Sequence, residues 1–166
     1  MYYGWEVRPE FAEFFDTLDL KGKNALDLGC GEGRYSIYLA NRGCHVTAVD
    51  FSNAGLLKLK KYADRTHLSI ITRHIDIADY AFPENYFDYI VAATVLDHLS
   101  EDTRRYVING IQHTVRDNGI IYVNVFTTSD PGYRLGHSLP SITGVISDTA
   151  VCIEHYFGEN ELRLLF

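Results

Sequence analysis

The sequence lacks the features that would assign the chain to several specialised classes of protein. It contains no apolar stretch of the ~18 residues that a membrane span needs, and residues 1–10 show no cationic start followed by an apolar run, so no secretory signal is predicted. The three cysteines have no CxxC spacing, which argues against both a zinc site and a disulfide scaffold. We therefore expect a soluble cytoplasmic protein with reduced thiols, no membrane partner and no metal site.

Basic residues are also scarce. The chain has 15 Lys and Arg against 22 Asp and Glu, a formal net charge of −7 at pH 7. A general nucleic-acid surface needs a basic face, and the cluster of Lys58, Lys60 and Lys61 is typical of a solvated helix face. No nucleic-acid partner is therefore expected. A length of 166 residues with 46% hydrophobic content suits one domain, residues 1–166, with a buried core.

Apolar strand patterns alternate with helical patterns along the chain. Strands are predicted at Asn24–Leu28, His45–Asp50, about Leu68–Arg73, Tyr89–Thr94 and Ile120–Phe126. Helices are predicted at Arg34–Asn41, after a cap at Ser52 or Asn53, at Glu101–Val115 and from Glu159. Strands separated by helices imply crossover connections. The predicted fold is α/β, a Rossmann-like doubly wound, mainly parallel sheet with helices on both faces.

Two segments join or follow these elements without helical or strand periodicity. Asp117, Asn118 and Gly119 are typical turn residues and lead into the fifth strand. Thr127–Val151 is rich in Gly, Ser, Thr and Pro and is predicted to be a loop. A loop of this length in a compact domain is usually functional or mobile.

A glycine-rich turn follows the first strand. Gly29, Gly31 and Gly33 permit a sharp bend and the close approach of a ligand, but their spacing is GxGxG and not the GxGxxG of dinucleotide-binding proteins. Asp27 and Glu32 beside the turn would repel a pyrophosphate at the helix N-terminus. They would favour S-adenosylmethionine (SAM), which carries an amine and a sulfonium and no phosphate. The alternative is a structural junction with incidental acids.

Acidic residues also follow the second and third strands. Asp50 lies 19 residues after the central glycine, near the ~20 expected for an acid that binds ribose hydroxyls, although it would serve equally as a helix cap. Phe51 would then lie against the adenine ring. Asp76 or Asp79 would accept the adenine amino group while the Ile77 backbone meets the ring, and we favour Asp76.

These segments together resemble the ordered motifs of class I SAM-dependent methyltransferases. The similar positions are Asp27–Gly33, Asp50, Asp76–Ile77 and Phe87–Leu99. More narrowly, the chain resembles the tellurite-resistance methyltransferase family in Asp27–Arg34, Tyr38–Ala40, Thr94–Leu96 and Glu159–Arg163. The resemblance implies cofactor contacts at Asp27, Gly29, Gly31, Gly33, Asp50, Phe51, Asp76, Ile77 and Ala93.

The resemblance also implies a reaction, the transfer of a methyl group from SAM to a small nucleophile such as tellurite, another chalcogen oxyanion or a metabolite. Asp97-His98 departs from the bulky hydrophobes that family members carry after Leu96, which leaves the acceptor open. Class I folds usually end with an antiparallel strand pair after the helix that begins near Glu159, and we expect this chain to lack that pair. The exposed sheet edge would then favour a homodimer.

Candidate catalytic and substrate residues follow from their places in this predicted fold. Methyl transfer depends chiefly on positioning, so a base is optional; His98 is the first candidate for one, with a surface histidine as the alternative. Arg34 would orient an oxyanion, Tyr3 would cover the cofactor, and His137 and His155 would roof the pocket. Solvation or packing is the alternative for each.

Two other functions stay open. A catalytically silent SAM-binding or assembly module would keep the glycine turn and Asp50 and lack activity. An NAD-binding oxidoreductase would require GxGxxG and no carboxylate beneath the pyrophosphate, so the sequence favours it least.

Overall fold

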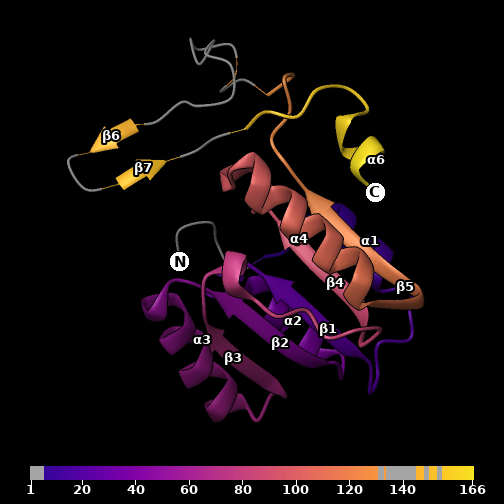
Figure 1. Cartoon of the computed structure of the whole chain (residues 1–166). Coiled ribbons are helices and arrows are strands. Elements are labelled where there is room, and N and C mark those ends of the chain that lie inside the picture. The colour runs from indigo at the N-terminus through magenta and orange to yellow at the C-terminus, as the bar shows by residue number, and fades with distance from the viewer. Residues whose placement is uncertain (1–5, 131–132, 134–144, 148–149, 153–154) are drawn as a thin grey trace.

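The computed structural model describes residues 6–130, 133, 145–147, 150–152 and 155–166, and it confirms the predicted α/β architecture. Five strands form one parallel sheet in the order β3-β2-β1-β4-β5 (Figure 1). These strands are β1 (Asn24–Leu28), β2 (His45–Asp50), β3 (Ile70–His74), β4 (Phe87–Ala93) and β5 (Val115–Asn124).

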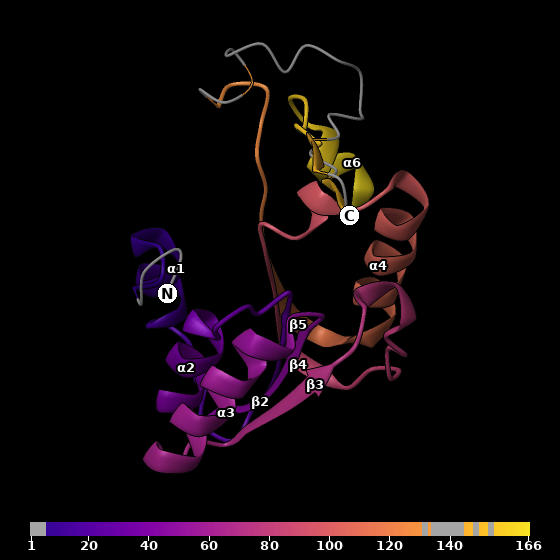
Figure 2. The ribbon, with the colours of Figure 1, turned by 90° about the vertical axis from the view of Figure 1, so that its left-hand side faces the viewer.

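Helices cover both faces of the sheet, with α1, α2 and α3 on one side and α4 on the other (Figure 2). The helices are α1 (Pro9–Phe15), α2 (Arg34–Asn41), α3 (Asn53–Thr66), α4 (Glu101–Thr114) and α6 (Glu161–Leu165), with short 3-10 turns at η1 (Ile77–Asp79) and η2 (Leu96–His98). Successive residues of β1 face opposite layers: Ala25 packs in the cluster of α1 and α2, and Leu26 packs in the cluster of α4. The central strands are largely apolar because they are covered from both sides.

Helix α1 was not predicted from the sequence. Phe11 and Phe15 lie one helical turn apart on the same face, their rings stack with centroids 4.1 Å apart, and both side chains are fully buried. The helix has only seven residues, too few to show a helical period unless the partner surface on the sheet is known.

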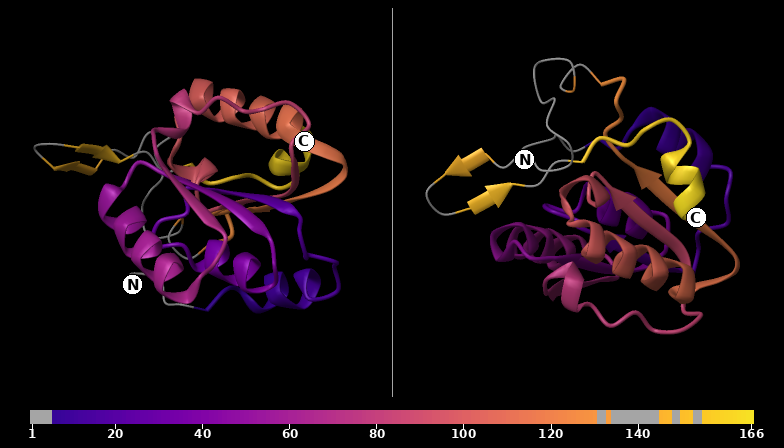
Figure 3. Two further views of the ribbon diagram at one scale, coloured as in Figure 1. Left: turned by 90° about the horizontal axis from the view of Figure 1, so that it is seen from below. Right: turned by 45° about the horizontal axis from the view of Figure 1, so that its top comes forward.

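Two connections differ from the prediction. Strand β5 begins at Val115, which pairs with Phe87; pairing then resumes between Ile120 and Tyr89. Residues 116–119 therefore form a bulge within β5, with Asn118 at φ +63°, where a separate turn was expected. The prediction of an irregular loop over Thr127–Val151 was also wrong in part. The short strands β6 (Val145–Ser147) and β7 (Ala150–Cys152) pair antiparallel and extend away from the main sheet (Figure 3).

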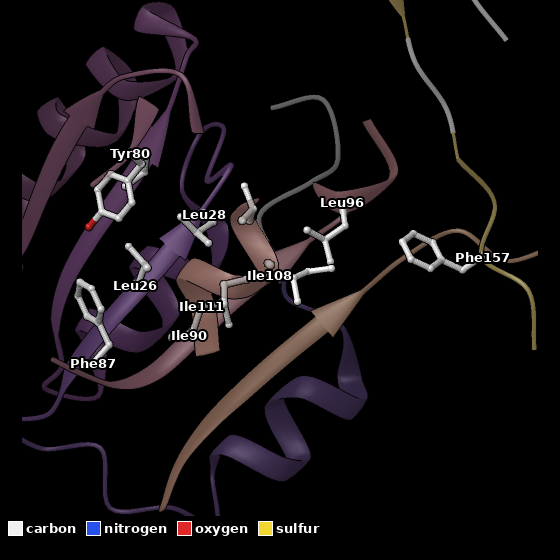
Figure 4. Close-up of a cluster of buried hydrophobic side chains, with 12 residues drawn as sticks. Leu26, Leu28, Tyr80, Phe87, Ile90, Leu96, Ile108, Ile111 and Phe157 are labelled. Carbon is white, nitrogen blue, oxygen red and sulfur yellow. The ribbon is translucent and has the colours of Figure 1, made fainter. Parts of the chain in front are cut away.

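The segment before α6 returns to the end of β5. The Phe157 amide donates to the Phe126 carbonyl (2.9 Å), and the Thr128 amide donates to the Phe157 carbonyl (3.1 Å). The Phe157 side chain, 1% exposed, enters the same core cluster as Leu26, Ile90 and Ile111 (Figure 4). Phe157 therefore anchors the segment 155–158 to the domain.

Strand β5 lies at one edge of the sheet. Over Ile120–Asn124 its ladder partner is β4, and no other described strand pairs with this stretch. The homodimer through this edge stays a prediction. Within the described part of the chain, none of the helices has the length and apolar character needed to cross a membrane.

Substitution of Phe157 tests its role as the anchor of segment 155–158. Phe157→Ala removes a fully buried ring and is expected to lower the free energy of unfolding by about 3–5 kcal/mol. Leu164→Ala in α6 is the control: its side chain is 80% exposed, so the change should stay within about 0.5 kcal/mol. Urea denaturation measures both, and a loss below 1 kcal/mol for Phe157→Ala would contradict the anchoring role.

Candidate functional site

The candidate site is a cavity at the carboxyl ends of β1, β2 and β4. Its volume is about 260 Å³. The lining residues are Gly29, Val49, Asp50, Phe51, Ile75, Asp76, Ile77, Thr94, Val95, His98 and Leu99. The strand order reverses direction between β1 and β4, and open α/β sheets bind ligands at this switch point, outside the carboxyl ends of the strands.

The glycine turn has the backbone conformation that its residues predict. Gly29, Gly31 and Gly33 all have left-handed φ values, of 62°, 55° and 85°. A Cβ on Gly29 would lie 2.3 Å from Val95 Cγ2, and one on Gly33 would lie 2.4 Å from Leu59 Cδ1. Gly29 therefore lets the turn approach the β4–α4 connection across the cavity, whereas Gly33 lets α3 pack under α2. Gly31 and Gly33 do not themselves line the cavity.

Asp50 joins the glycine turn to the end of β2. Its Oδ2 accepts a hydrogen bond from the Gly31 amide (2.7 Å) and its Oδ1 accepts one from the Ser52 amide (2.6 Å). The N-cap of α3 is Ser52, whose hydroxyl accepts from the Gly55 amide, so Asp50 is not the cap of that helix. The carboxylate is 9% exposed and lines the cavity, and with about four lone-pair sites it retains capacity for further donors.

Phe51 and the segment after β3 form the outer wall of the cavity. The Phe51 ring is 78% exposed beside Asp50 and lines the cavity. Asp76 and Ile77 both line the cavity, whereas Asp79 does not. Asp76 also caps η1 by accepting from the Ala78 amide (2.9 Å). Of the two acids that the sequence left open, Asp76 is therefore the one that lies at the cavity.

Asp27 and Ala93, like Gly31 and Gly33, were expected to contact the cofactor but do not line the cavity. Asp27 is 1% exposed, and its Oδ2 accepts from the Ser36 amide (2.9 Å) and hydroxyl (2.6 Å). It therefore holds α2 against β1 instead of facing a ligand. Burial raises the pKa of Asp27 to about 7, although the Ser36 hydrogen bonds oppose this rise. Ala93 also lies outside the lining, because the chain reaches the cavity one residue later, at Thr94 and Val95.

Glu32, the other acid of the turn, pairs with a lysine of α3. Its Oε1 lies 2.6 Å from Lys58 Nζ, and this hydrogen-bonded ion pair lowers the pKa of Glu32. The carboxylate is therefore partly neutralised at the surface of the turn, and Asp50 and Asp76 remain the acids that line the cavity.

Asp97 is a buried acid whose importance the sequence did not reveal. The residue is fully buried; Oδ1 accepts from the Phe126 amide (2.6 Å), and Oδ2 has no hydrogen-bond partner among the described residues. Burial raises the pKa of Asp97 to about 6. The available signal was an acid close to the apolar residues Val95, Leu96 and Leu99.

The candidates for catalysis and substrate binding do not all lie at the cavity. His98 is exposed and lines the cavity. His155 does not line it, and its Nε2 lies 2.6 Å from Glu161 Oε1. Arg34 is also outside the lining, with its guanidinium 4.8 Å from the centre of the Tyr35 ring. Tyr3 and His137 lie outside the described residues.

A larger groove of about 980 Å³ lies between β5 and α6. It is lined by apolar residues such as Ile121, Val123 and Leu162, and it includes neither the glycine turn nor Asp50 or Asp76. The smaller cavity is the better candidate because the chemically distinctive residues converge there.

Comparison with known proteins identifies a family model and related sequences. Residues 25–119, more than half of the chain, match the model of the methyltransferase domain. The chain is 27% identical over 124 residues to a ubiquinone biosynthesis O-methyltransferase of Glaesserella parasuis, a match that covers 72% of this chain and 52% of that protein. The chain therefore spans about half the length of the curated relatives that it matches.

Solved structures with the same fold include TehB from Haemophilus influenzae, with a TM-score of 0.75 and 24% identity over 99% of this chain and 51% of that one. Another is the 1,6-didemethyltoxoflavin-N1-methyltransferase of Burkholderia thailandensis, with a TM-score of 0.73 and 24% identity over 95% of this chain and 64% of that one. At these identities the likeness establishes the fold.

The raised pKa of Asp27 predicts a pH-dependent stability. Below the unfolded pKa of 3.8 the protonated group imposes no penalty, and stability is lost as the pH rises through about 7 because the folded protein must bury a charge. Asp27→Asn keeps an oxygen for the Ser36 donors and cannot ionise. Its stability relative to wild type should therefore rise between pH 4 and 7, by up to about 1.4 kcal/mol per pH unit. Urea denaturation across this range measures the difference, and a difference independent of pH would contradict the prediction.

Proposed function

The chain belongs to the methyltransferase-domain family, and from this premise we propose that it binds S-adenosylmethionine in the cavity and transfers the methyl group to a small nucleophilic molecule. The observation that carries the proposal is the placement of Asp50, at the end of β2, between the glycine turn and the exposed Phe51 ring. Since the chain spans about half of its curated relatives, the activity of the whole protein is part of the proposal.

The lining of the cavity fits a cationic ligand without phosphate. Two carboxylates, Asp50 and Asp76, line it, and among the described residues no Lys or Arg does. A pyrophosphate would lie near these carboxylates without a cationic partner in the lining, which disfavours NAD. The volume of about 260 Å³ is near the lower limit of about 300 Å³ for small-molecule sites, and the cavity is open to solvent on one side.

Each lining residue has a role in this proposal. The Asp50 carboxylate accepts the ribose hydroxyls, since charged acceptors form stronger hydrogen bonds than neutral ones. The exposed Phe51 ring supplies a flat apolar face for the adenine. Asp76 accepts the adenine amino group, and Ile77 covers the ring. Gly29 lets the ligand approach the turn, while Gly31 and Gly33 shape that turn from outside the cavity.

Methyl transfer depends chiefly on how the acceptor is positioned. S-adenosylmethionine supplies a methyl group on a positively charged sulfur, already activated toward nucleophiles. The chain's part is to hold the acceptor in line with that methyl group, which by itself accelerates reactions strongly. His98 lines the cavity and is the group that would take a proton from an acceptor that carries one.

The relatives support a small-molecule acceptor. The relative of G. parasuis is named for O-methylation in ubiquinone biosynthesis, and the structure from B. thailandensis contains bound 1,6-didemethyltoxoflavin and S-adenosylhomocysteine. Tellurite, the oxyanion suggested by the sequence resemblance, stays an alternative acceptor. Arg34, the cation expected to orient it, does not line the cavity.

The unpaired thiols of Cys30 and Cys44 support a reducing compartment such as the cytoplasm.

Calorimetric titration tests cofactor binding. Wild type is expected to bind S-adenosylmethionine and not NAD. Asp50→Ala should weaken binding at least tenfold, since hydrogen bonds to a charged group contribute about 1.5–3 kcal/mol. Phe51→Ala should weaken it about threefold or more through loss of the adenine contact. Leu57→Ala is the control, because this side chain is 50% exposed on α3 and does not line the cavity.

Two outcomes would contradict the proposal: unchanged affinity for S-adenosylmethionine in Asp50→Ala that melts at the wild-type temperature, or NAD binding without S-adenosylmethionine binding. A methyl-release assay over a panel of small acceptors separates an active enzyme from a silent binding module. The silent module would bind S-adenosylmethionine with the predicted pattern of variants and release no methyl group to any acceptor.

A further inference from the structure

A row of aromatic rings leads away from the cavity. The ring centroids of His98 and Phe126 are 6.1 Å apart at 84°, those of Phe126 and Tyr156 are 5.9 Å apart at 29°, and those of Tyr156 and Tyr133 are 5.5 Å apart at 53°. We call these four side chains the aromatic row. They come from η2, the chain after β5 and the segment before α6, so no sequence window contains them together.

The aromatic row begins at the wall of the cavity. His98 lines the cavity directly. Phe126 follows β5, two residues beyond Asn124, whose carbonyl accepts from the amide of Thr94, another lining residue (2.8 Å). The row therefore extends from the carboxyl ends of β4 and β5. The chain after β5 and the segment before α6 run next to each other in this region (Figure 1).

Asp97 fixes the position of the row relative to the cavity. Its Oδ1 accepts from the Phe126 amide (2.6 Å), and its backbone carbonyl accepts from the His155 amide (2.8 Å). These bonds connect the chain after β5, at Phe126, and the segment before α6, at His155, to the residue that precedes His98. The buried Phe157 anchors the same segment in the core. Asp97 is thus a positioning residue that holds a surface built from three separate segments.

The exposure of the row distinguishes it from core packing. Phe157, next to Tyr156, is 1% exposed, whereas Tyr133 is 40% exposed, His98 is exposed, and Phe126 and Tyr156 are partly exposed. Flat aromatic faces left partly open beside a cavity are a surface on which another planar ring can stack. The row presents rings and hydroxyl groups, and no ammonium or guanidinium group that would select an oxyanion.

We propose that the aromatic row binds the methyl acceptor, and that the acceptor is a planar aromatic molecule carrying a nucleophilic hydroxyl or amino group. The proposal rests on the proposed function, because the row is adjacent to the cavity assigned to the cofactor. In the transfer, the acceptor's oxygen or nitrogen bonds to the methyl carbon, the carbon–sulfur bond breaks with its electron pair on sulfur, and the acceptor's proton leaves to His98.

Binding of two matched probes to the whole chain tests this proposal. 2-Naphthol is planar, and decahydro-2-naphthol has the same carbon skeleton and hydroxyl without flat faces. Saturation-transfer NMR is expected to show 2-naphthol binding to wild type at least fivefold more tightly than decahydro-2-naphthol. Phe126→Leu and Tyr156→Leu remain apolar and lose the flat face, so each should weaken 2-naphthol binding at least fivefold while the affinity for S-adenosylmethionine stays within twofold.

Tyr86→Leu is the matched control. Tyr86 is an exposed tyrosine, 46% accessible, which directly precedes β4. It therefore lies at the amino end of that strand, whereas the cavity lies at the carboxyl ends. Its substitution should leave the binding of both probes and of S-adenosylmethionine within twofold of wild type. Tyr133→Leu, at a 40% exposed position, gives a second test of the row if either inner variant fails to fold. It should also weaken 2-naphthol binding.

The outcomes separate the two proposals. If S-adenosylmethionine binds and its affinity depends on Asp50, but the row variants leave 2-naphthol binding unchanged or the two probes bind equally, the aromatic row is not the acceptor site. Methyl transfer to tellurite at the same rate in wild type and Phe126→Leu, with no 2-naphthol binding, would also overturn it. If S-adenosylmethionine does not bind, the proposed function fails, and loss of 2-naphthol binding in the row variants would still establish the row as an aromatic-binding surface.

Discussion

The cavity depends on the carboxylate of Asp50. One of its oxygens accepts from the Gly31 amide at 2.7 Å and the other accepts from the Ser52 amide at 2.6 Å, so a single side chain joins the turn after β1 to the connection after β2. Hydrogen bonds from amides to a charged acceptor are short and strong. They hold the left-handed glycine turn in place, and Phe51 follows from the same strand end. The proposed ribose acceptor therefore also shapes the site that it serves.

Two further acids, Asp27 and Asp97, are buried and join separate elements of the fold. Asp27 binds Ser36 and joins β1 to α2, while Asp97 binds the Phe126 amide and joins η2 to the end of β5. Burial raises the pKa of both carboxyl groups, to about 7 and about 6. Burying an ionised carboxylate opposes folding. Each of these acids nevertheless directly precedes a functional segment: Asp27 precedes the glycine turn of the cavity, and Asp97 precedes His98 of the aromatic row. Hydrogen bonds to these two acids therefore hold the strand ends in place. Such bonds are more directional than apolar packing.

The central elements and part of the lining of the candidate cavity could be predicted from the sequence. Strands β1 and β2 and helix α2 have the predicted bounds, because apolar runs and the glycines between them restrict the backbone locally. Asp50 ends one parallel strand and Asp76 follows another, and both line the cavity because the carboxyl ends of such strands meet at one edge. Asp27 precedes the glycine turn, but that position does not show which layer its side chain enters, and the side chain is buried against Ser36.

The alternation of strands and helices, the glycine turn and the acids at the strand ends could be predicted because they depend on residues close together along the chain. The remaining features depend on contacts between distant parts of the chain. Helix α1 and strands β6 and β7 are too short for a visible period, and they form against partners distant in sequence. The aromatic row joins His98 to Tyr156 across 58 positions through Phe126, and the neighbouring Phe157 lies in the core. Long-range packing places such residues, and no local pattern records it.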